Sequence, residues 1–296
     1  MNMPQDATDG GAIQRLELTT EEFARQYDRP AKPVVLANVI RQWPAASEWT
    51  PEFFRARYGE LRLPVIFPDG HQVELPLSEF LDHVAASTPD EPGPYLYGIM
   101  FEQHMPELLP AIRPAPGTGP AFLGTRLLPQ LRRFRDGRPE LLIASPGANF
   151  LLHYDDLHVH TYVTQVRGDK LFWMYPPEQT PYMYPRPDQR NVSQIDRVEP
   201  LDEQRFPLFR TARPLQALVR EGDSIYIPAG WWHHTRTLSA SIAIRHEAAT
   251  PSNWEEFCND YVLGSRVRNP LTPWRQAKLG YMRGVGRLLG AIRPLT

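Results

Sequence analysis

The chain has 296 residues, enough to bury a sizeable core, and its 32 basic and 34 acidic side chains nearly balance. This balance gives no electrostatic reason to expect a nucleic-acid partner, and no apolar run approaches the roughly twenty residues that a membrane-spanning helix needs. The single cysteine, Cys258, excludes an internal disulfide framework and fits a reducing compartment. We therefore expect a cytoplasmic protein with neither a nucleic acid nor a membrane as its partner. Residues 1–20 are expected to be a flexible end, because they begin with a polar stretch that lacks the features of a signal peptide.

Helix starts recur in the N-terminal part of the chain. Thr19 precedes two glutamates and is expected to cap a first helix, and Pro51 is expected to occupy the first turn of a second one. A third helix should begin near residue 75, with Ser78 as its cap. The apolar run 32–36 predicts a strand. Residues 87–120 are rich in proline and glycine, so we expect long loops there.

From residue 141 onward the pattern changes to short apolar runs, several of them bounded by Gly, Pro or Asp. The 32 prolines and 19 glycines of the chain agree with this change, because proline is confined to helix starts, sheet edges and turns. Strands at this density indicate a mainly β fold, a barrel or sandwich, with helices as accessories. The runs expected to be strands are 141–144, 150–155, 162–166, 171–175, 224–227 and 241–244.

Helical periodicity returns after residue 250. Residues 253–263 are expected to be helical, and 274–292 place apolar residues at intervals of three and four. Seven basic and no acidic residues lie from Arg266 onward, but several glycines weaken the case for an independent membrane-surface or nucleic-acid helix. We expect residues 251–296 to be a helical extension that docks on the core at 21–250 or on a second copy, which would give a homodimer.

His153, Asp155 and His233 are the residues with the most chemical content. Two imidazoles and one carboxylate can occupy one face of an octahedral ion, which is the arrangement of non-haem Fe(II) sites that activate O2. His153 and Asp155 are two residues apart, so they point the same way in a strand, and the third ligand must come from a remote strand. His234 competes with its neighbour, although adjacent strand residues face opposite sides.

Five motifs in order carry a resemblance to the jumonji-C, cupin-like hydroxylases. That resemblance covers roughly residues 32–247 and implies a double-stranded β-helix that uses Fe(II), 2-oxoglutarate and O2. It also implies His153, Asp155 and His233 as the iron ligands, because the family ligand is the first histidine after the tryptophan. The motifs are His153-Tyr154-Asp155, Gly168-Asp169-Lys170, Tyr175-Pro176-Pro177, Gly222-Asp223-Ser224-Ile225-Tyr226-Ile227-Pro228 and Trp231-Trp232-His233.

The same resemblance assigns cosubstrate contacts. Lys170 matches the basic residue that holds the distal carboxylate of 2-oxoglutarate, and an ammonium facing a carboxylate in a partly dry barrel makes a charge-assisted bond. The alternative for Lys170 is an ordinary hairpin lysine. Related chains carry a small polar residue where this chain has Arg245, which could hold the cosubstrate, pair with Glu247 or contact substrate.

Two further alternatives concern side chains near the ligands. Many relatives carry an asparagine at the position of Val163, so cosubstrate contacts could come instead from Tyr162, Thr161 or Thr164. The pair His158 and His160 is a rival for the metal, because His-x-His is the metal pair of ordinary cupins and both rings would share one strand face.

The function implied by the resemblance is a 2-oxoglutarate-dependent oxygenase. Hydroxylation of a protein or peptide side chain, or of a small molecule, is the expected reaction, and demethylation would be the same step on an N-methyl carbon. The alternatives are a cupin-fold binding protein without turnover and an oxoglutarate-independent cupin enzyme. Loops 87–120 and 178–220 should form a mouth suited to an extended polar or acidic substrate, with walls that include Tyr95, Tyr97, Phe101, Tyr182, Tyr184, Arg186, Arg190 and Arg197.

Overall fold

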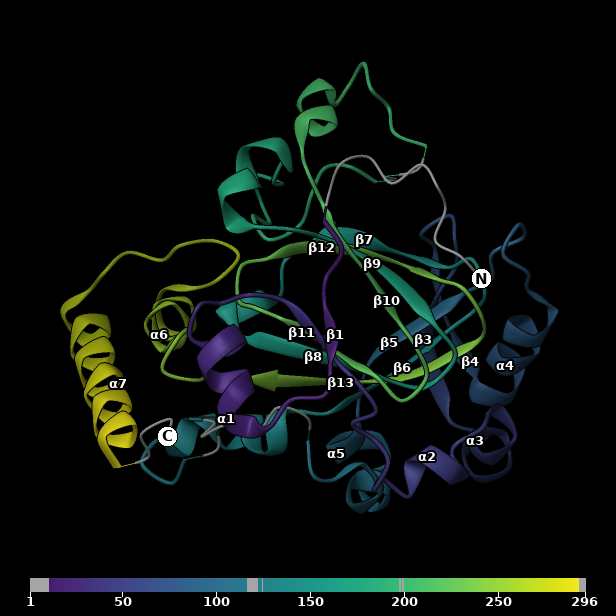
Figure 1. Ribbon diagram of the computed structural model, residues 1–296, viewed down its shortest axis with the longest axis horizontal. Helices are drawn as coiled ribbons and strands as arrows, with labels where there is room; N and C mark the ends of the chain where they lie inside the picture. Colours follow the sequence, from purple (N-terminus) through teal and green to yellow (C-terminus); the bar gives the residue numbers. More distant parts are fainter. Residues whose placement is uncertain (1–10, 116–121, 124, 197, 199, 293–296) are drawn as a thin grey trace.

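The computed structural model describes residues 11–292, apart from 116–121, 124, 197 and 199 (Figure 1). Residues 1–10 of the expected flexible end lie outside the described part. Residues 11–19 differ from the expectation, because Ala12 bridges to Gln216 and strand β1 (Arg15–Leu16) pairs in parallel with β2 (Val34–Leu36). This part of the expected end therefore pairs with strands of the fold.

The described strands form two sheets, and one apolar cluster takes residues from both. Their orders are β1-β2-β11-β8-β13-β6-β5-β3-β4 and β10-β9-β12-β7. The expected double-stranded β-helix core is confirmed, and all six predicted strands have counterparts. The remaining strands are β3 Arg62–Ile66, β4 Gln72–Pro76, β5 Tyr95–Met100, β6 Glu140–Ala144, β7 Asn149–His153, β8 His160–Arg167, β9 Lys170–Tyr175, β10 Leu215–Val219, β11 Ser224–Ile227, β12 Trp232–Thr237 and β13 Ser241–Ala248.

The core between the sheets is built by alternate residues of facing strands. Val163 of β8 and Ala243 of β13 point inward from the larger sheet, and Phe172 and Met174 of β9 do so from the smaller one. Neighbouring residues on the same strands point outward, where Ile244 joins the cluster under the N-terminal helices. This alternation lets one strand supply both a packed outer face and an inner face that can hold polar groups.

The helices lie at the margins of the sheets (Figure 1). Thr19 caps α1 as expected, but the chain continues as a π-helical turn at Ala24–Asp28. Thr50 and Pro51 begin α3 as expected. The expectation for Ser78 is wrong, because α4 begins at Leu77 and the Ser78 hydroxyl donates to the Gly59 carbonyl, 3.0 Å away. The helices are α1 Thr20–Phe23, α2 Ala45–Glu48, α3 Pro51–Tyr58, α4 Leu77–Ala86, α5 Phe101–His104, α6 Trp254–Leu263 and α7 Pro273–Ile292.

The segment 87–120 is not a long loop throughout. It contains β5, which pairs with β3 and β6 inside the larger sheet, followed by α5 and a 3-10 helix at Pro106–Ile112. Residues 116–120 lie outside the described part. The strand was not predicted from the sequence because proline and glycine are frequent on both sides of it. Strand β5 begins at Tyr95 and places this side chain inside the fold.

The C-terminal helices α6 and α7 share an apolar cluster with the barrel side. Phe257 of α6 and Met282 of α7 are both fully buried there, beside Val159 and Ala249, which flank the barrel strands β8 and β13. The expected docking on the core is therefore observed for one face of α7. Among the described helices, none combines the length and the apolar character that crossing a membrane requires.

Candidate metal centre

Two antiparallel strands bring the predicted ligands together. Strand β7 ends at His153, two residues earlier than predicted, and Asp155 follows in an extended conformation just before a 3-10 turn. On the neighbouring strand β12, His233 lies directly opposite His153. One ligand atom from each of the three side chains lies within 4.8 Å of the others, and His233 Nε2 is 3.9 Å from Asp155 Oδ2.

The three side chains suit a divalent metal ion in their hydrogen bonding. His153 Nδ1 lies 2.9 Å from the Leu151 carbonyl and His233 Nδ1 lies 3.1 Å from the Trp231 carbonyl, which leaves each Nε2 for a ligand. Asp155 Oδ2 is buried without a hydrogen-bond partner in the described part of the chain. An orphaned carboxylate oxygen beside two oriented imidazoles is the arrangement that a bound cation completes.

Burial and charge keep these groups in their ligand forms. Burial lowers the pKa of His153 to about 3, and the nearby His233 contributes further, so the ring is neutral near pH 7. Burial also lowers the pKa of His233. Burial alone would raise the pKa of the Asp155 carboxyl, but Arg245 and the two imidazoles outweigh it and lower that pKa. The site therefore presents two neutral imidazoles and one anionic carboxylate.

The rival histidines have other partners. The His234 ring stacks on Trp173, with centroids 4.5 Å apart, on the face of β12 opposite to His233. His158 Nδ1 lies 2.5 Å from Asp260, and His160 contacts Ser252 and accepts from the Ala229 amide. These contacts give the three rings structural roles outside the triad.

Lys170 lies deeper in the barrel, at the start of β9. Its side chain is fully buried, and its Nζ lies 3.2 Å from the Tyr95 hydroxyl and 4.9 Å from the centre of that ring. Burial lowers the pKa of Lys170 to about 7, and no carboxylate of the described residues forms a salt bridge with it. A buried amine without an anionic partner is a suitable site for a ligand carboxylate. Tyr95 was expected in the wall of the mouth, and the pairing of β5 places it both beside Lys170 and in the lining of the cavity described below.

Residues 19–246 match the protein family described as "Cupin-like domain". The chain belongs to the cupin-like domain family. Relatives include "Lysine-specific demethylase JMJ21" of Arabidopsis thaliana (25% identical, 86% of this chain, 27% of the relative), "Lysine-specific demethylase JMJ30" of the same plant (29%, 78% and 53%) and "Bifunctional peptidase and (3S)-lysyl hydroxylase JMJD7" of Homo sapiens (26%, 76% and 80%). The chain thus spans about a quarter and about half of the two plant relatives.

Arg245 of this cupin-like domain is surrounded by carboxylates. Its guanidinium lies 3.0 Å from Asp155 Oδ1, 3.1 Å from Glu140 and 2.9 Å from Glu247. Arg138 pairs with the same Glu247 at 3.3 Å. Of the three roles considered for Arg245, pairing with Glu247 is present, and the contact with the metal-ligand candidate Asp155 was not foreseen. Both terminal nitrogens of the Arg245 guanidinium are already paired with carboxylates of the protein. Lys170 forms no salt bridge with the described residues, so it is the better candidate to bind the cosubstrate carboxylate.

The threonine and tyrosine considered as cosubstrate contacts lie on opposite faces of β8. Thr161 faces the interior, and its buried hydroxyl has no hydrogen-bond partner among the described residues. Tyr162 faces outward and packs against Phe23 and Tyr226, so it lies outside the site. Thr164 also faces outward and donates to Ser224. Neighbouring residues of a strand point to opposite faces of the sheet, so the register of β8 decides which of these side chains faces the interior. The sequence alone did not determine that register.

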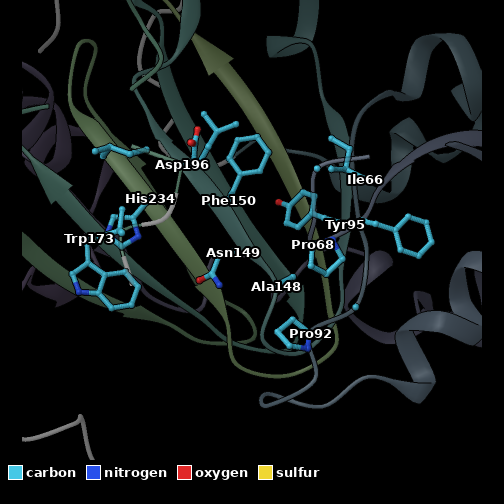
Figure 2. Close-up of a pocket in the computed structure, with 16 residues that line it drawn as sticks. Ile66, Pro68, Pro92, Tyr95, Ala148, Asn149, Phe150, Trp173, Asp196 and His234 are labelled. Atoms are coloured by element: carbon cyan, nitrogen blue, oxygen red, sulfur yellow. The ribbon is translucent and has the colours of Figure 1, made fainter. Parts of the chain in front are cut away.

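A cavity of about 450 Å³ runs along the free side of β7 (Figure 2). Phe150 lies at its centre, with its ring 5.1 Å from that of His153. Tyr95 lies on one side, and the stacked pair Trp173 and His234 lies on the other. The triad and Lys170 do not line this cavity themselves, but two of its lining residues contact them, Phe150 through His153 and Tyr95 through Lys170.

The expected basic mouth is not reproduced. Arg190 is bound to the buried Asp260, and Arg186 is engaged by Ser193 and Asp196. Phe101 is fully buried in the N-terminal cluster, and Arg197 lies outside the described residues. The cavity wall contributes Asp196 rather than a row of cations, so the sequence-based expectation of an acidic substrate loses its support.

Proposed function

We propose that this chain is an Fe(II)- and 2-oxoglutarate-dependent oxygenase that hydroxylates a side chain of a protein or peptide. The observation that supports it most is the triad, in which Asp155 Oδ2 lacks a partner between two oriented imidazoles. The relatives named as demethylases and as a lysyl hydroxylase agree with an oxygenase at this site. The single buried cysteine supports a cytoplasmic location as part of the same proposal.

The residues of the candidate site have separate roles in this proposal. Iron bound here with 2-oxoglutarate would supply the O2 chemistry that oxidises a substrate C–H bond. His153, Asp155 and His233 would hold the ion through two imidazole nitrogens and one carboxylate oxygen. Arg245 fixes one oxygen of Asp155, so the other is directed at the metal position. Lys170, whose Nζ lies beside the Tyr95 hydroxyl, would bind the distal carboxylate of 2-oxoglutarate.

The cavity beside β7 is the proposed path of the substrate. Its wall combines Phe150, Leu151 and Trp173 with the polar Asn149 and a few other groups, a mixture that suits an extended peptide better than a highly charged ligand. Leu151 is 39% exposed at the edge of the cavity, next to His153. A peptide lying there would bring one side chain over the triad while its neighbours contact the apolar wall.

Succinate release tests the activity. The chain supplied with Fe(II), ascorbate and 2-oxoglutarate should release succinate, and Asp155→Ala should not. Mass spectrometry of a peptide library then separates the outcomes, because hydroxylation adds one oxygen to a peptide whereas demethylation removes a methyl group as formaldehyde. Iron-loaded protein that releases no succinate, with or without peptides, would instead favour a non-catalytic or oxoglutarate-independent cupin.

A further inference from the structure

His160, the first residue of β8, contacts the turn that precedes the metal-ligand candidate His233. Within that turn the Trp231 amide donates to the Pro228 carbonyl at 3.2 Å. The Ala229 amide donates outside the turn, to His160 Nδ1 at 3.0 Å. The His160 side chain is buried, so this hydrogen bond is shielded from competing water. One imidazole nitrogen of β8 therefore holds the backbone of the turn.

The His160 ring is held on both of its edges. Because Nδ1 accepts from the Ala229 amide, the ring proton is on Nε2, which lies 2.8 Å from the Ser252 hydroxyl. Asp28 Oδ1 lies 3.4 Å from the same nitrogen. Burial lowers the pKa of His160 to about 3, so the ring is neutral near pH 7 and Nδ1 remains an acceptor. The ring thus connects the turn to the N-terminal helical segment and to the residues that follow β13.

The same turn determines the orientation of His233. The Trp231 carbonyl lies 3.1 Å from His233 Nδ1, and such a contact sets the direction in which a ligand imidazole faces. The Trp231 indole donates to the Ala31 carbonyl at 3.1 Å. The turn is therefore held at two points, its Ala229 amide and its Trp231 side chain. A displacement of the turn would move the partner of His233 Nδ1 and with it the ligand ring.

His158 contacts this turn from the loop that carries Asp155. A Cβ on Gly230 would lie 3.7 Å from His158 Nε2 and Cδ2, so the ring packs against this glycine. Gly230 has a φ of 77°, which favours glycine at this place in a tight turn. On the other edge of the ring, His158 Nδ1 lies 2.5 Å from Asp260, and the His158 carbonyl accepts from Asn253 at 2.7 Å. The His158 ring therefore lies between the Asp155 loop and the turn.

We propose that His158 and His160 are positioning residues of the metal centre. Together they hold the turn before His233 in a fixed place relative to the loop that carries Asp155. The two histidines flank Val159, which is 1% exposed in the cluster shared with α6 and α7, so the segment that carries them is itself anchored. Ligands held in advance in this way bind an ion more tightly than ligands that must first be ordered. This inference rests on the metal centre proposed above.

Two substitutions of His160 separate the contributions of its two edges. In His160→Asn the side-chain oxygen can lie where Nδ1 lies now, which keeps an acceptor for the Ala229 amide. In His160→Gln the side-chain amide can lie near the present Nε2, which keeps the contact with Ser252 but leaves the Ala229 amide without its acceptor. Both variants lose the same buried ring, so urea titration should show comparable losses of stability. A difference between them in metal binding therefore reports on the bond to the turn.

Titration of metal-free protein with Co(II) tests this role, because the visible absorption of Co(II) responds to its coordination geometry. The wild-type chain and His160→Asn should bind Co(II) with affinities within about threefold of each other, whereas His160→Gln should bind about 10- to 100-fold more weakly and with an altered spectrum. Ser252→Ala removes the Nε2 partner at an exposed position and should match the wild-type chain. Wild-type Co(II) binding by His160→Gln, or equal losses in His160→Asn and His160→Gln, would overturn the positioning role.

A double-mutant cycle tests whether the two histidines act on the same turn. His158→Asn removes the ring from Gly230 but keeps a residue type that tolerates the φ of 47° found there. This variant should bind Co(II) about tenfold more weakly. Once His160→Gln has released the turn, adding His158→Asn should cost at most about a further threefold. Fully additive losses would show independent effects and overturn the joint action.

The wild-type titration distinguishes failure of this inference from failure of the metal centre. A wild-type chain that binds no Co(II) would overturn the metal centre and this inference together. A wild-type chain that binds Co(II) no better than the His158 and His160 variants would overturn the positioning role alone. The His158 side chain is 24% exposed, so His158→Asn supplies the test by itself if His160→Gln does not fold. Wild-type Co(II) affinity in His158→Asn would then contradict the proposal.

Discussion

Asp155 divides its two carboxylate oxygens between different partners, Arg245 and the proposed metal position. Asp155→Ala removes the only anionic ligand, so we expect almost complete loss of bound iron, measured by metal analysis of the purified protein. His233→Ala should behave in the same way. His234→Ala is the matched control, because its ring stacks on Trp173 on the other face, and it should retain iron. Loss of iron from His234→Ala but not from His233→Ala would exchange the two assignments.

Arg245 is expected to act on the metal through Asp155. Arg245→Met removes the donor to Asp155 Oδ1 and frees that carboxylate to rotate, so iron affinity should fall about 10- to 100-fold. Arg245→Lys should recover only part of this, because an ammonium cannot serve three carboxylates in one plane. Arg138→Met is the control: Arg138 shares Glu247 with Arg245 but has no described contact with Asp155. Equal losses of iron affinity in both variants would point to general destabilisation instead.

Lys170 should make cosubstrate binding depend on pH. Its pKa is lowered to about 7 from an ordinary 10.5, so above pH 7 the free protein must take up a proton before the ammonium can bind a carboxylate. Titration calorimetry should show 2-oxoglutarate affinity falling roughly tenfold per pH unit above pH 7. In Lys170→Ala the affinity should be about ten- to a hundredfold weaker at pH 7 and should lose that slope, with iron content unchanged. A pH slope that persists in Lys170→Ala would assign the proton to another group.

The turn after Asp155 is held by the C-terminal extension. Leu157 and His158 both have positive φ values, 60° and 47°, which cost backbone energy and need outside support. His158 Nδ1 bonds to Asp260 of α6, a carboxylate with 0% side-chain exposure that also receives Arg190 and Arg268. The metal loop and helix α6 therefore stabilise each other, although they are about a hundred residues apart in the chain.

Removing the carboxylate of Asp260 should be costly. Asp260→Ala leaves two guanidinium groups and one imidazole without their shared partner, so the free energy of unfolding should fall by about 3–5 kcal/mol in urea titrations. Asp196→Ala is the control, because Asp196 also pairs with two arginines but is 67% exposed, and it should cost less than about 1 kcal/mol. Similar losses in the two variants would show that burial of the cluster contributes little.

Sequence patterns predicted the elements whose signals are local. Thr19, Thr50 and Pro51 begin helices where capping chemistry requires it, and apolar runs located six strands. Strand β12 lacked such a signal, because its inner face presents His233 and Thr235 rather than apolar residues. Strand β5 was concealed by proline-rich flanks. Ser78 has the residue type of a cap, but a tertiary hydrogen bond to Gly59 decides its role.

The candidate site likewise combines features with a local sequence signal, which were predicted, and long-range contacts, which were not. The triad was predicted because two ligands are two residues apart and because the resemblance to the jumonji-C hydroxylases assigned the third, which lies on β12 just after the turn that precedes it. Tyr95 beside Lys170, and Arg245 between Asp155 and Glu140, could not be foreseen from local patterns, since both contacts join strands far apart in the chain. The face of β8 that holds Thr161 also depends on strand register, which the sequence did not determine.

On the scale of the whole molecule, the C-terminal extension belongs to the same packed body as the barrel. Val159 and Ala249 of the barrel side lie in one cluster with Phe257 of α6 and Met282 of α7. Arg266 and Arg268 add ion pairs to Asp156 and Asp260. Removing everything from residue 266 would therefore expose part of a core, although each proposed metal ligand precedes it.

Two apolar side chains on opposite faces of α7 should contribute very differently to stability. Met282 is fully buried against α6, so Met282→Ala should lower the free energy of unfolding by about 2–5 kcal/mol, measured by urea titration. Leu288→Ala, six residues on and facing outward, should leave that value within about 0.5 kcal/mol. The difference follows from contacts: Met282→Ala leaves a cavity inside the cluster shared with α6, whereas Leu288 is 49% exposed. If Leu288→Ala destabilised the chain as much as Met282→Ala, its outward face would be packed within the chain and the description of two different faces of α7 would fail.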